Sequence, residues 1–430
     1  MRSFKNKHLW LLFFGFLISI VIRAWLILNS KHVADIELLY LMGNEILRGN
    51  NPYISLDYNI YPPLALYLEA ITIHLSNFLK IPFYVLTRVW PNLADLVIGI
   101  LLFKFLTKLN IKPIIASFWS LVFVLNPISI IISAAHGQID SIPSLFLLLT
   151  IYYLYFYSSK FYIFLAALML GVGIAVKPNP LMLLPFFLFT VKYNTKKVII
   201  FLIFSLLPIS LLLIPFLIPN FVQVISKVLT YSGVYDFSLA GIVRSWIYQD
   251  NANHWLQTQV QSQMLLNSKI SFLGGAFFLF VLYLRSKELI KALLSVYLLF
   301  LGVYFGISAQ YLIWVLPLAI IERSKIFFAY CIVSFISLLG FYLFFGPEIL
   351  LGRYGNIVIN QSKYMTLIFI GNVGLYLVVI FWLTQNIIKM WRVKIKNSSK
   401  IYRSFLYFSL TLFIILLLPT IQLIVETVSF

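Results

Sequence analysis

Long apolar runs alternate with short polar connections along almost the whole chain. A helix needs about 20 apolar residues to cross the hydrocarbon core of a bilayer, because each residue advances it by about 1.5 Å. The candidate spans are 9–29, 84–106, 114–134, 141–158, 161–177, 181–191, 198–218, 271–284, 290–307, 309–321, 326–346, 365–387 and 404–424. Two of them, 181–191 and 309–321, are short or tilted spans beside polar motifs. The pattern predicts an all-α, polytopic integral membrane protein with about 13 transmembrane helices.

Two long connections fall on the same predicted side of the membrane, the outer one, at about 30–83 and about 219–270. Connections of this length without a domain of their own tend to be functional. Within the first, segment 63–80 is interrupted by Glu69, His74 and Asn77, so we expect an interfacial helix there rather than a span. No internal repeat or low-complexity tract divides the chain, and we treat 1–430 as a single domain.

Composition and charge support this interpretation. Of the 430 residues, 62% are hydrophobic and 10% charged, whereas a soluble domain is about half apolar and about a quarter charged. The formal net charge of +19 comes from basic residues, about two thirds of which fall on inner connections if the amino terminus is cytoplasmic. Membrane orientation therefore explains the excess, and no nucleic-acid partner is needed. The amino-terminal run from Leu9 to Leu28 resembles a retained signal anchor.

Several cofactor motifs are missing from the sequence. It contains one cysteine, Cys331, and no P-loop, dinucleotide-binding fingerprint, HExxH motif or Cys/His metal cluster. ATP-driven and zinc-dependent mechanisms therefore have no support.

The first candidate residues are Asp35 and Glu37, at the start of the first outer connection. Two carboxylates at this spacing share a side of an extended chain but diverge on a helix. Such a pair can bind a cation or supply a catalytic base. The alternative is that Asp35 caps a helix beginning at Ile36.

A second cluster, His136-Gly137-Gln138-Ile139-Asp140, lies at the outer end of the third span. It places a histidine, an amide and a carboxylate between long apolar runs, and Gly137 permits a turn or a close approach to a ligand. The alternative is a polar turn in which Asp140 caps the next helix.

Two further polar motifs interrupt apolar segments on the same predicted face. Lys177-Pro178-Asn179-Pro180 places an ammonium between apolar runs, where it can hold a phosphate as a point charge or snorkel to the headgroups. Gln310 and Tyr311 form a similar polar notch. The candidate residues on this face are Asp35, Glu37, His136, Gln138, Asp140, Lys177, Gln310 and Tyr311, and their convergence indicates one active site. Asp95, by contrast, follows Arg88 by two helical turns and is interpreted as a structural pairing or a buried hydrogen bond.

The order of these motifs resembles that of the GT-C membrane glycosyltransferases, and most closely the prokaryotic mannosyltransferase-like proteins related to the second GPI mannosyltransferase. The motifs that carry the resemblance are Asp35–Glu37, Gly49–Tyr53, Tyr61–Leu64, Asn92–Asp95, Asn126–Pro127, His136–Ser141, Val176–Pro178 and Gln310–Pro317. In the family an aromatic residue often precedes the glycine of this motif, whereas this sequence has His136 at that position.

The resemblance implies transfer of a hexose, with mannose expected, from a polyprenyl-phosphate sugar donor to a glycan or glycolipid acceptor at the outer face. Asp35 is then the catalytic base, with Glu37 as helper or alternative, and Lys177 contacts the donor phosphate. Direct displacement inverts the anomeric carbon. The protein is expected in a prokaryotic cell membrane, or in the endoplasmic reticulum membrane if it is eukaryotic. A divalent cation, magnesium or manganese, is left open as a cofactor.

Two other classes of protein stay open at this point. A polytopic transporter or a flippase of lipid-linked saccharides also uses broken helices and intramembrane charges, although its site usually lies at the membrane midplane. A membrane scaffold without catalysis does not need the cluster from His136 to Asp140.

Overall fold

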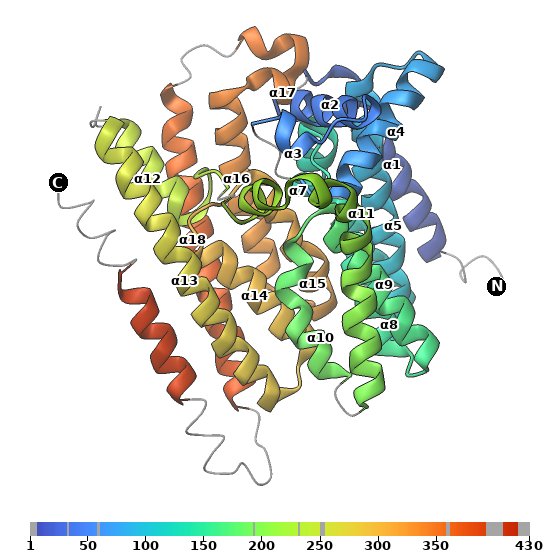
Figure 1. The fold of residues 1–430 in the computed structure, drawn as a ribbon, viewed down its shortest axis with the longest axis vertical. Coiled ribbons are helices and arrows are strands. Elements are labelled where there is room, and N and C mark those ends of the chain that lie inside the picture. Colours follow the sequence, from blue (N-terminus) through green and yellow to red (C-terminus); the bar gives the residue numbers. More distant parts are fainter. Residues whose placement is uncertain are drawn as a thin grey trace. The chain divides into compact units, whose positions relative to one another are not determined.

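The computed structural model describes residues 7–31, 34–57, 61–191, 194–230, 233–249, 254–357, 362–392 and 407–419. Over these ranges the regular elements are helices, as Figure 1 shows, so the predicted all-α class is confirmed. The chain forms two compact units, one of Met1–Tyr231 with Gly346–Ile359 and one of Ser232–Phe345 with Asn360–Phe430. Each unit is described by itself, and the single domain expected over 1–430 stays a prediction.

Seven described helical stretches are long and apolar enough to cross a membrane: Lys7–Asn29, Phe83–Lys108, Pro113–His136, Thr195–Ile218, Gln263–Ser286, Ile326–Phe345 and Lys363–Arg392. Six shorter apolar helices accompany them: Ser141–Phe156, Lys160–Val176, Asn179–Thr190, Leu289–Val303, Ala309–Glu322 and Tyr407–Pro419. Each of the 13 predicted spans overlaps one of these stretches, and both ends of the last one, 404–406 and 420–424, lie outside the described residues. Many of their large apolar side chains, such as Phe13, Phe118 and Ile332, are exposed, as expected for a surface in contact with lipid. The chain is therefore a multi-pass membrane protein.

The first unit is a bundle of long helices with short helices at one end. Its elements are α1 (Lys7–Asn29), α2 (Ala34–Leu47), α3 (Pro52–Ser55), α4 (Pro63–Leu79), α5 (Phe83–Lys108), α6 (Pro113–Val124), α7 (Pro127–Ile130), η1 (Ile131–His136), α8 (Ser141–Phe156), α9 (Lys160–Val176), η2 (Asn179–Leu183), α10 (Leu184–Thr190), α11 (Thr195–Thr230), α17 (Pro347–Leu351) and η4 (Gly352–Ile357). Helix α9 packs between α8 and α11, and α5 packs on α6 and α8. In Figure 1, α2, α3 and α4 gather at the end of this bundle where α1 finishes.

The described part of the connection at 30–83, which is predicted to be outer, is therefore folded rather than irregular. Helix α4 occupies the predicted interfacial segment 63–80, and α2 packs along it. A polar residue that interrupts α4, Glu69, is turned inward and accepts a hydrogen bond from the Thr87 hydroxyl at 2.9 Å. Burial raises the pKa of Glu69 to about 8, so this carboxyl is neutral at pH 7.

The second unit contains α12 (Ser238–Gln249), α13 (His254–Ser286), α14 (Leu289–Val303), η3 (Ala309–Trp314), α15 (Val315–Glu322), α16 (Ile326–Phe345) and α18 (Ser362–Arg392). Helix α18 is its central element and packs against α12, α13, α14 and α16. Most of the described part of the predicted loop at 219–270 is also helical. Helix α11 continues past a kink at Asn220, and α12 and α13 follow it in the chain.

A buried polar network ties α1 to the core of the first unit. The guanidinium of Arg23 donates to Asp95 at 2.8 Å and to Asn92 at 2.7 Å. The same oxygen of Asp95, Oδ2, also accepts from the Ser129 hydroxyl at 2.8 Å, and Oδ1 accepts from the Ser141 hydroxyl at 2.6 Å. Asp95 is thus in a structural ion pair, but the expected partner Arg88 is wrong. Helix packing brings Arg23 to it from 72 positions away along the chain.

The Asp95 network also fixes the segment that contains the motif from His136 to Asp140. Ser129 lies on α7, just before η1, and Ser141 begins α8. Asp95 therefore holds both ends of the segment that contains His136 to Asp140. A satisfied buried network of this kind fixes the local backbone more firmly than apolar packing alone.

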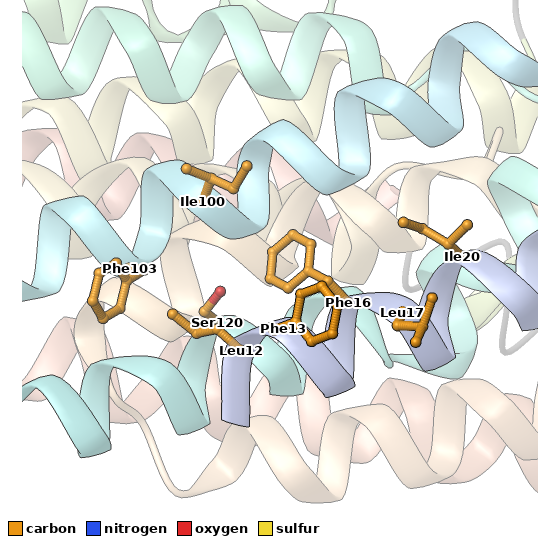
Figure 2. Close-up of a pocket in the computed structure, with 8 residues that line it drawn as sticks. All are labelled: Leu12, Phe13, Phe16, Leu17, Ile20, Ile100, Phe103 and Ser120. Atoms are coloured by element: carbon orange, nitrogen blue, oxygen red, sulfur yellow. The ribbon is translucent and has the colours of Figure 1, made fainter. Parts of the chain in front are cut away.

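A separate hollow lies between α1, α5 and α6, as Figure 2 shows. It has a volume of about 290 Å³, and its lining is apolar except for Ser120, whose hydroxyl donates to the carbonyl of Gly99. It shares no residue with the polar motifs, so it does not form part of the site described below.

Candidate active site

An irregular helix end presents His136 and Gln138. After α7 the chain widens into the π-helical turn η1, and Gly137 then adopts a left-handed conformation with φ of 86°. The backbone N–H groups of Gly137 and Gln138 both donate to the carbonyl of Ile132 at 3.0 Å. A side chain at Gly137 would strike Arg88 and Ile36, because a Cβ there would lie 2.9 Å from Cγ of Arg88. The glycine predicted as a turn is therefore required here for conformation and for space. The π-helical turn itself was not predicted.

The Asp35 carboxylate is the centre of the site. One of its oxygens, Oδ2, accepts from the Gln138 amide at 2.5 Å and lies 3.1 Å from Nε2 of His136. Helix α2 begins at Ala34, so Asp35 sits inside the first turn and not at the cap position. The alternative reading of Asp35 as a helix cap is thus not what the structure shows. About half of its side chain, 47%, stays exposed, which leaves room for a ligand.

Opposing effects act on the ionisation of Asp35. Burial by surrounding protein raises its pKa, while the hydrogen bond and charge of His136, the charge of Lys177 and the hydrogen bond from Gln138 lower it. The net result is a pKa below the ordinary aspartate value. Asp35 is therefore an ionised carboxylate at neutral pH.

A buried ion pair lies beside this carboxylate. The ammonium of Lys177 donates to Asp140 at 2.6 Å, and both side chains are almost completely buried. Helix α9 ends at Val176, and the extended backbone at Lys177 directs the chain into the short η2 helix. Asp140 does precede α8 as its cap residue, but its side chain makes no capping bond and is held by Lys177 instead.

Tyr61 links the Asp35–Gln138 contact to the Lys177–Asp140 ion pair. Its hydroxyl donates to the Gln138 side chain at 3.2 Å, and the Lys177 ammonium lies 5.5 Å from the centre of its ring. The neighbouring Tyr53 hydroxyl donates to the carbonyl of Tyr61 at 2.8 Å and so fixes this segment. The aromatic residues of the first outer connection thus form a wall of the site, as well as part of its hydrogen-bond network.

Arg88 is a supporting residue that sequence reasoning missed. Its buried guanidinium donates to the carbonyls of Lys31 at 2.8 Å and Ala135 at 2.9 Å. These two carbonyls belong to the segment entering α2 and to the residue before His136. Arg88 therefore clamps together the two segments that carry Asp35 and His136. A basic residue near the end of a predicted span is a signal that sequence reasoning could have used. The sequence does not reveal which backbone carbonyls this residue contacts.

The remaining candidates are Glu37, on α2, and two residues of the second unit. Glu37 is exposed on α2, and two residues along a helix are rotated by roughly 200°, so Glu37 points away from Asp35. Gln310 and Tyr311 lie on η3 in the second unit, where the Tyr311 ring packs 4.4 Å from that of Trp314. The contacts described above are made within the first unit, and the roles of Glu37, Gln310 and Tyr311 stay predictions.

The part of the chain that the structure describes contains no preformed cluster of metal ligands. No three His, Cys, Asp or Glu side chains come together there in a way that could hold an ion. Magnesium or manganese as a cofactor stays a prediction.

Fold and site together define a multi-pass membrane protein with a partly open carboxylate beside a buried lysine–aspartate pair. Over 159 residues the sequence is 30% identical to GPI mannosyltransferase 1 of Candida albicans, which agrees with the resemblance to mannosyltransferase-like GT-C proteins. The matched region covers 35% of this chain, and it spans only about a third, 36%, of that relative.

No family model matches the chain. Among solved structures, apo ArnT from Cupriavidus metallidurans aligns with a TM-score of 0.48 at 10% sequence identity, over 87% of this chain and 76% of that one.

Proposed function

We propose that this protein is a GT-C-type membrane glycosyltransferase with Asp35 as its catalytic base. It transfers a hexose, with mannose expected, from a polyprenyl-phosphate sugar to a glycan or glycolipid acceptor at the outer face of a prokaryotic cell membrane, its amino terminus being cytoplasmic. The observation that carries the proposal is the Asp35 carboxylate, half exposed and held through one oxygen by His136 and Gln138.

The proton of the acceptor hydroxyl goes to Asp35. Both described contacts fall on Oδ2, which leaves Oδ1 to accept that proton. The acceptor oxygen forms a bond to the anomeric carbon while the bond from that carbon to the phosphate oxygen breaks. The electron pair of the broken bond stays on the lipid phosphate, and the configuration at the anomeric carbon inverts.

One catalytic base is enough because the leaving group of the donor is a phosphate. A glycosidase needs a second carboxyl to protonate a sugar alkoxide, whereas a phosphate leaves without being protonated. It needs positive charge nearby instead. Lys177 supplies that charge, and Asp140 holds the ammonium in place at 2.6 Å.

An apolar pocket next to this pair suits the lipid part of the donor. The pocket has a volume of about 350 Å³ and its lining includes Leu64, Tyr67, Ile142 and Val176. Val176 directly precedes Lys177, and Ile142 lies two residues after Asp140. A chain lying in the pocket would bring its phosphate towards the Lys177 ammonium.

The test uses the full-length protein in proteoliposomes with a panel of radiolabelled polyprenyl-phosphate sugars and extracted acceptor lipids. We expect transfer from one donor, with loss of transfer in Asp35→Asn and unchanged expression and donor binding. The exposed Asp57→Asn serves as the matched control on the same outer connection. Near-normal turnover by Asp35→Asn overturns the assignment of the base. Absence of transfer from every donor, together with movement of the labelled lipid across the bilayer, favours a flippase.

A further inference from the structure

The second unit contains a polar cavity that the proposed reaction does not use. It has a volume of about 340 Å³ and lies where α14, α15, α16 and α18 meet. Its polar lining residues are Glu322, Arg323, Ser324, Lys325, Gln385, Asn386 and Lys389. Topology places this end of the helices on the predicted cytoplasmic side, opposite to the outer connections.

The charge around the cavity is positive. Arg323, Lys325 and Lys389 contribute three cations to the lining, and Glu322 contributes one carboxylate. Glu322 lies in the electrostatic range of Arg323, Lys389 and Lys291. Lys291 is also paired with Glu288, so it adds no net charge to the surroundings. A cavity with this balance attracts an anion and repels a metal cation.

A buried amide is part of the lining of the same cavity. Asn386 is only 3% exposed, and its side-chain Nδ2 has no hydrogen-bond partner in the part of the chain that is described. A buried amide without a partner is costly, and such groups are rare in folded proteins. An oxygen acceptor bound in the cavity would remove that cost.

Local backbone geometry presents the basic residues. Arg323 adopts a left-handed conformation with φ of 50° in the turn between α15 and α16. Ser324, Lys325 and Ile326 line the cavity at the start of α16, a helix of 20 residues whose amino end carries partial positive charge. The apolar walls come from Leu294, Ile326 and Trp382.

We propose that this cavity binds the phosphate of an anionic phospholipid from the cytoplasmic leaflet. The phosphate oxygens accept from Asn386 and pair with Arg323, Lys325 and Lys389, while Leu294 and Trp382 contact the glycerol and the first carbons of the acyl chains. Basic pockets between transmembrane helices on the cytoplasmic side are typical sites for anionic headgroups. The site shares no residue with the Asp35 cluster, so it stands independently of the proposed transferase activity.

The test measures lipid binding to the purified full-length protein in neutral detergent. Spin-labelled phosphatidylglycerol is titrated against spin-labelled phosphatidylcholine, and the immobilised fraction is followed by electron paramagnetic resonance. We expect tighter binding of phosphatidylglycerol, and roughly a tenfold or greater loss of its affinity in the double variant Arg323→Gln/Lys389→Gln. A matched control, Lys104→Gln/Lys112→Gln, removes the same charge from exposed inner positions of the first unit and should keep wild-type affinity.

A second variant separates recognition from simple charge. Asn386→Leu leaves the net charge unchanged and fills the same space with an apolar group, so it should fold and yet bind phosphatidylglycerol more weakly. Equal binding of the two lipids by the wild type overturns the proposal, as does an equal loss in the control and cavity variants. Displacement of the lipid by inorganic phosphate at an equal concentration would assign the cavity to free phosphate and overturn the lipid assignment.

Discussion

Two polar clusters in the first unit use similar chemistry under opposite exposure to solvent. Around Arg23 and Asp95 every charged oxygen and nitrogen is enclosed, and three serines and an asparagine complete the hydrogen bonds. Around Asp35 the carboxylate is half exposed and both of its described contacts fall on one oxygen. The enclosed cluster has no capacity left for a substrate, so its role is structural. The open cluster leaves part of the Asp35 carboxylate accessible, which its proposed role as a proton acceptor requires.

Substitution of Asp35 provides the largest expected difference between the clusters. Asp35→Asn should lower transfer by about 10²–10⁴-fold, because a general base contributes that much to the rate. The thermal midpoint should hardly change, because the side chain is half exposed. The measurements are initial rates in proteoliposomes and thermal unfolding in detergent. A large loss of stability with retained activity would reverse the roles of the two clusters.

Breaking the enclosed cluster should have the opposite signature. Asp95→Leu leaves the Arg23 guanidinium buried without its partner and should reduce the free energy of unfolding by about 3–5 kcal/mol. The double variant Arg23→Leu/Asp95→Leu removes both charges and should recover much of that loss. Thermal or denaturant unfolding of the three proteins gives the answer. A double variant that is as unstable as the single one would show that packing, and not the ion pair, sets the cost.

The Lys177–Asp140 pair lies between these extremes, since it is buried but borders the open site. Lys177→Ala should weaken donor binding by about tenfold through loss of one charge-assisted hydrogen bond, with a smaller effect on turnover. Binding of a radiolabelled donor and the separate values of KM and kcat check this. Asp140→Asn should follow the same direction, because it releases the ammonium from its fixed place. Unchanged donor affinity in both variants would make the pair purely structural.

The smallest expected effect concerns pH. The pKa of Asp35 lies below the ordinary value because hydrogen bonds and positive charge outweigh burial, so its carboxylate form persists to lower pH than in a free aspartate. Activity should therefore fall only when the pH drops through that lowered pKa. Gln138→Leu removes a donor to the ionised form and should move this acid limb to higher pH. A rate profile against pH for the two proteins measures the shift, and a limb that stays in place would argue that Asp35 is not the titrating group.

Sequence alone located the apolar spans and singled out the polar residues among them, but it predicted neither the helices within 219–270 nor the π-helical turn. Spans could be located because crossing a bilayer imposes a length and an apolar composition on each helix. Asp35, His136, Gln138, Asp140 and Lys177 stood out because polar groups are expensive among apolar runs. The structure brings these five side chains into one network, while their catalytic roles stay predictions.

Only the tertiary structure decided which partners meet. Spacing along one helix suggested Arg88 for Asp95, yet the partner is Arg23 on another helix, and Asp140 was open as a cap before Lys177 proved to hold it. The π-helical turn before Gly137, the clamp by Arg88 and the Asn386 amide nitrogen, which has no partner among the described residues, were likewise invisible in the sequence. The reason is physical: periodicity reports which residues share a face of one helix, but contacts between helices distant in sequence depend on how their side chains pack.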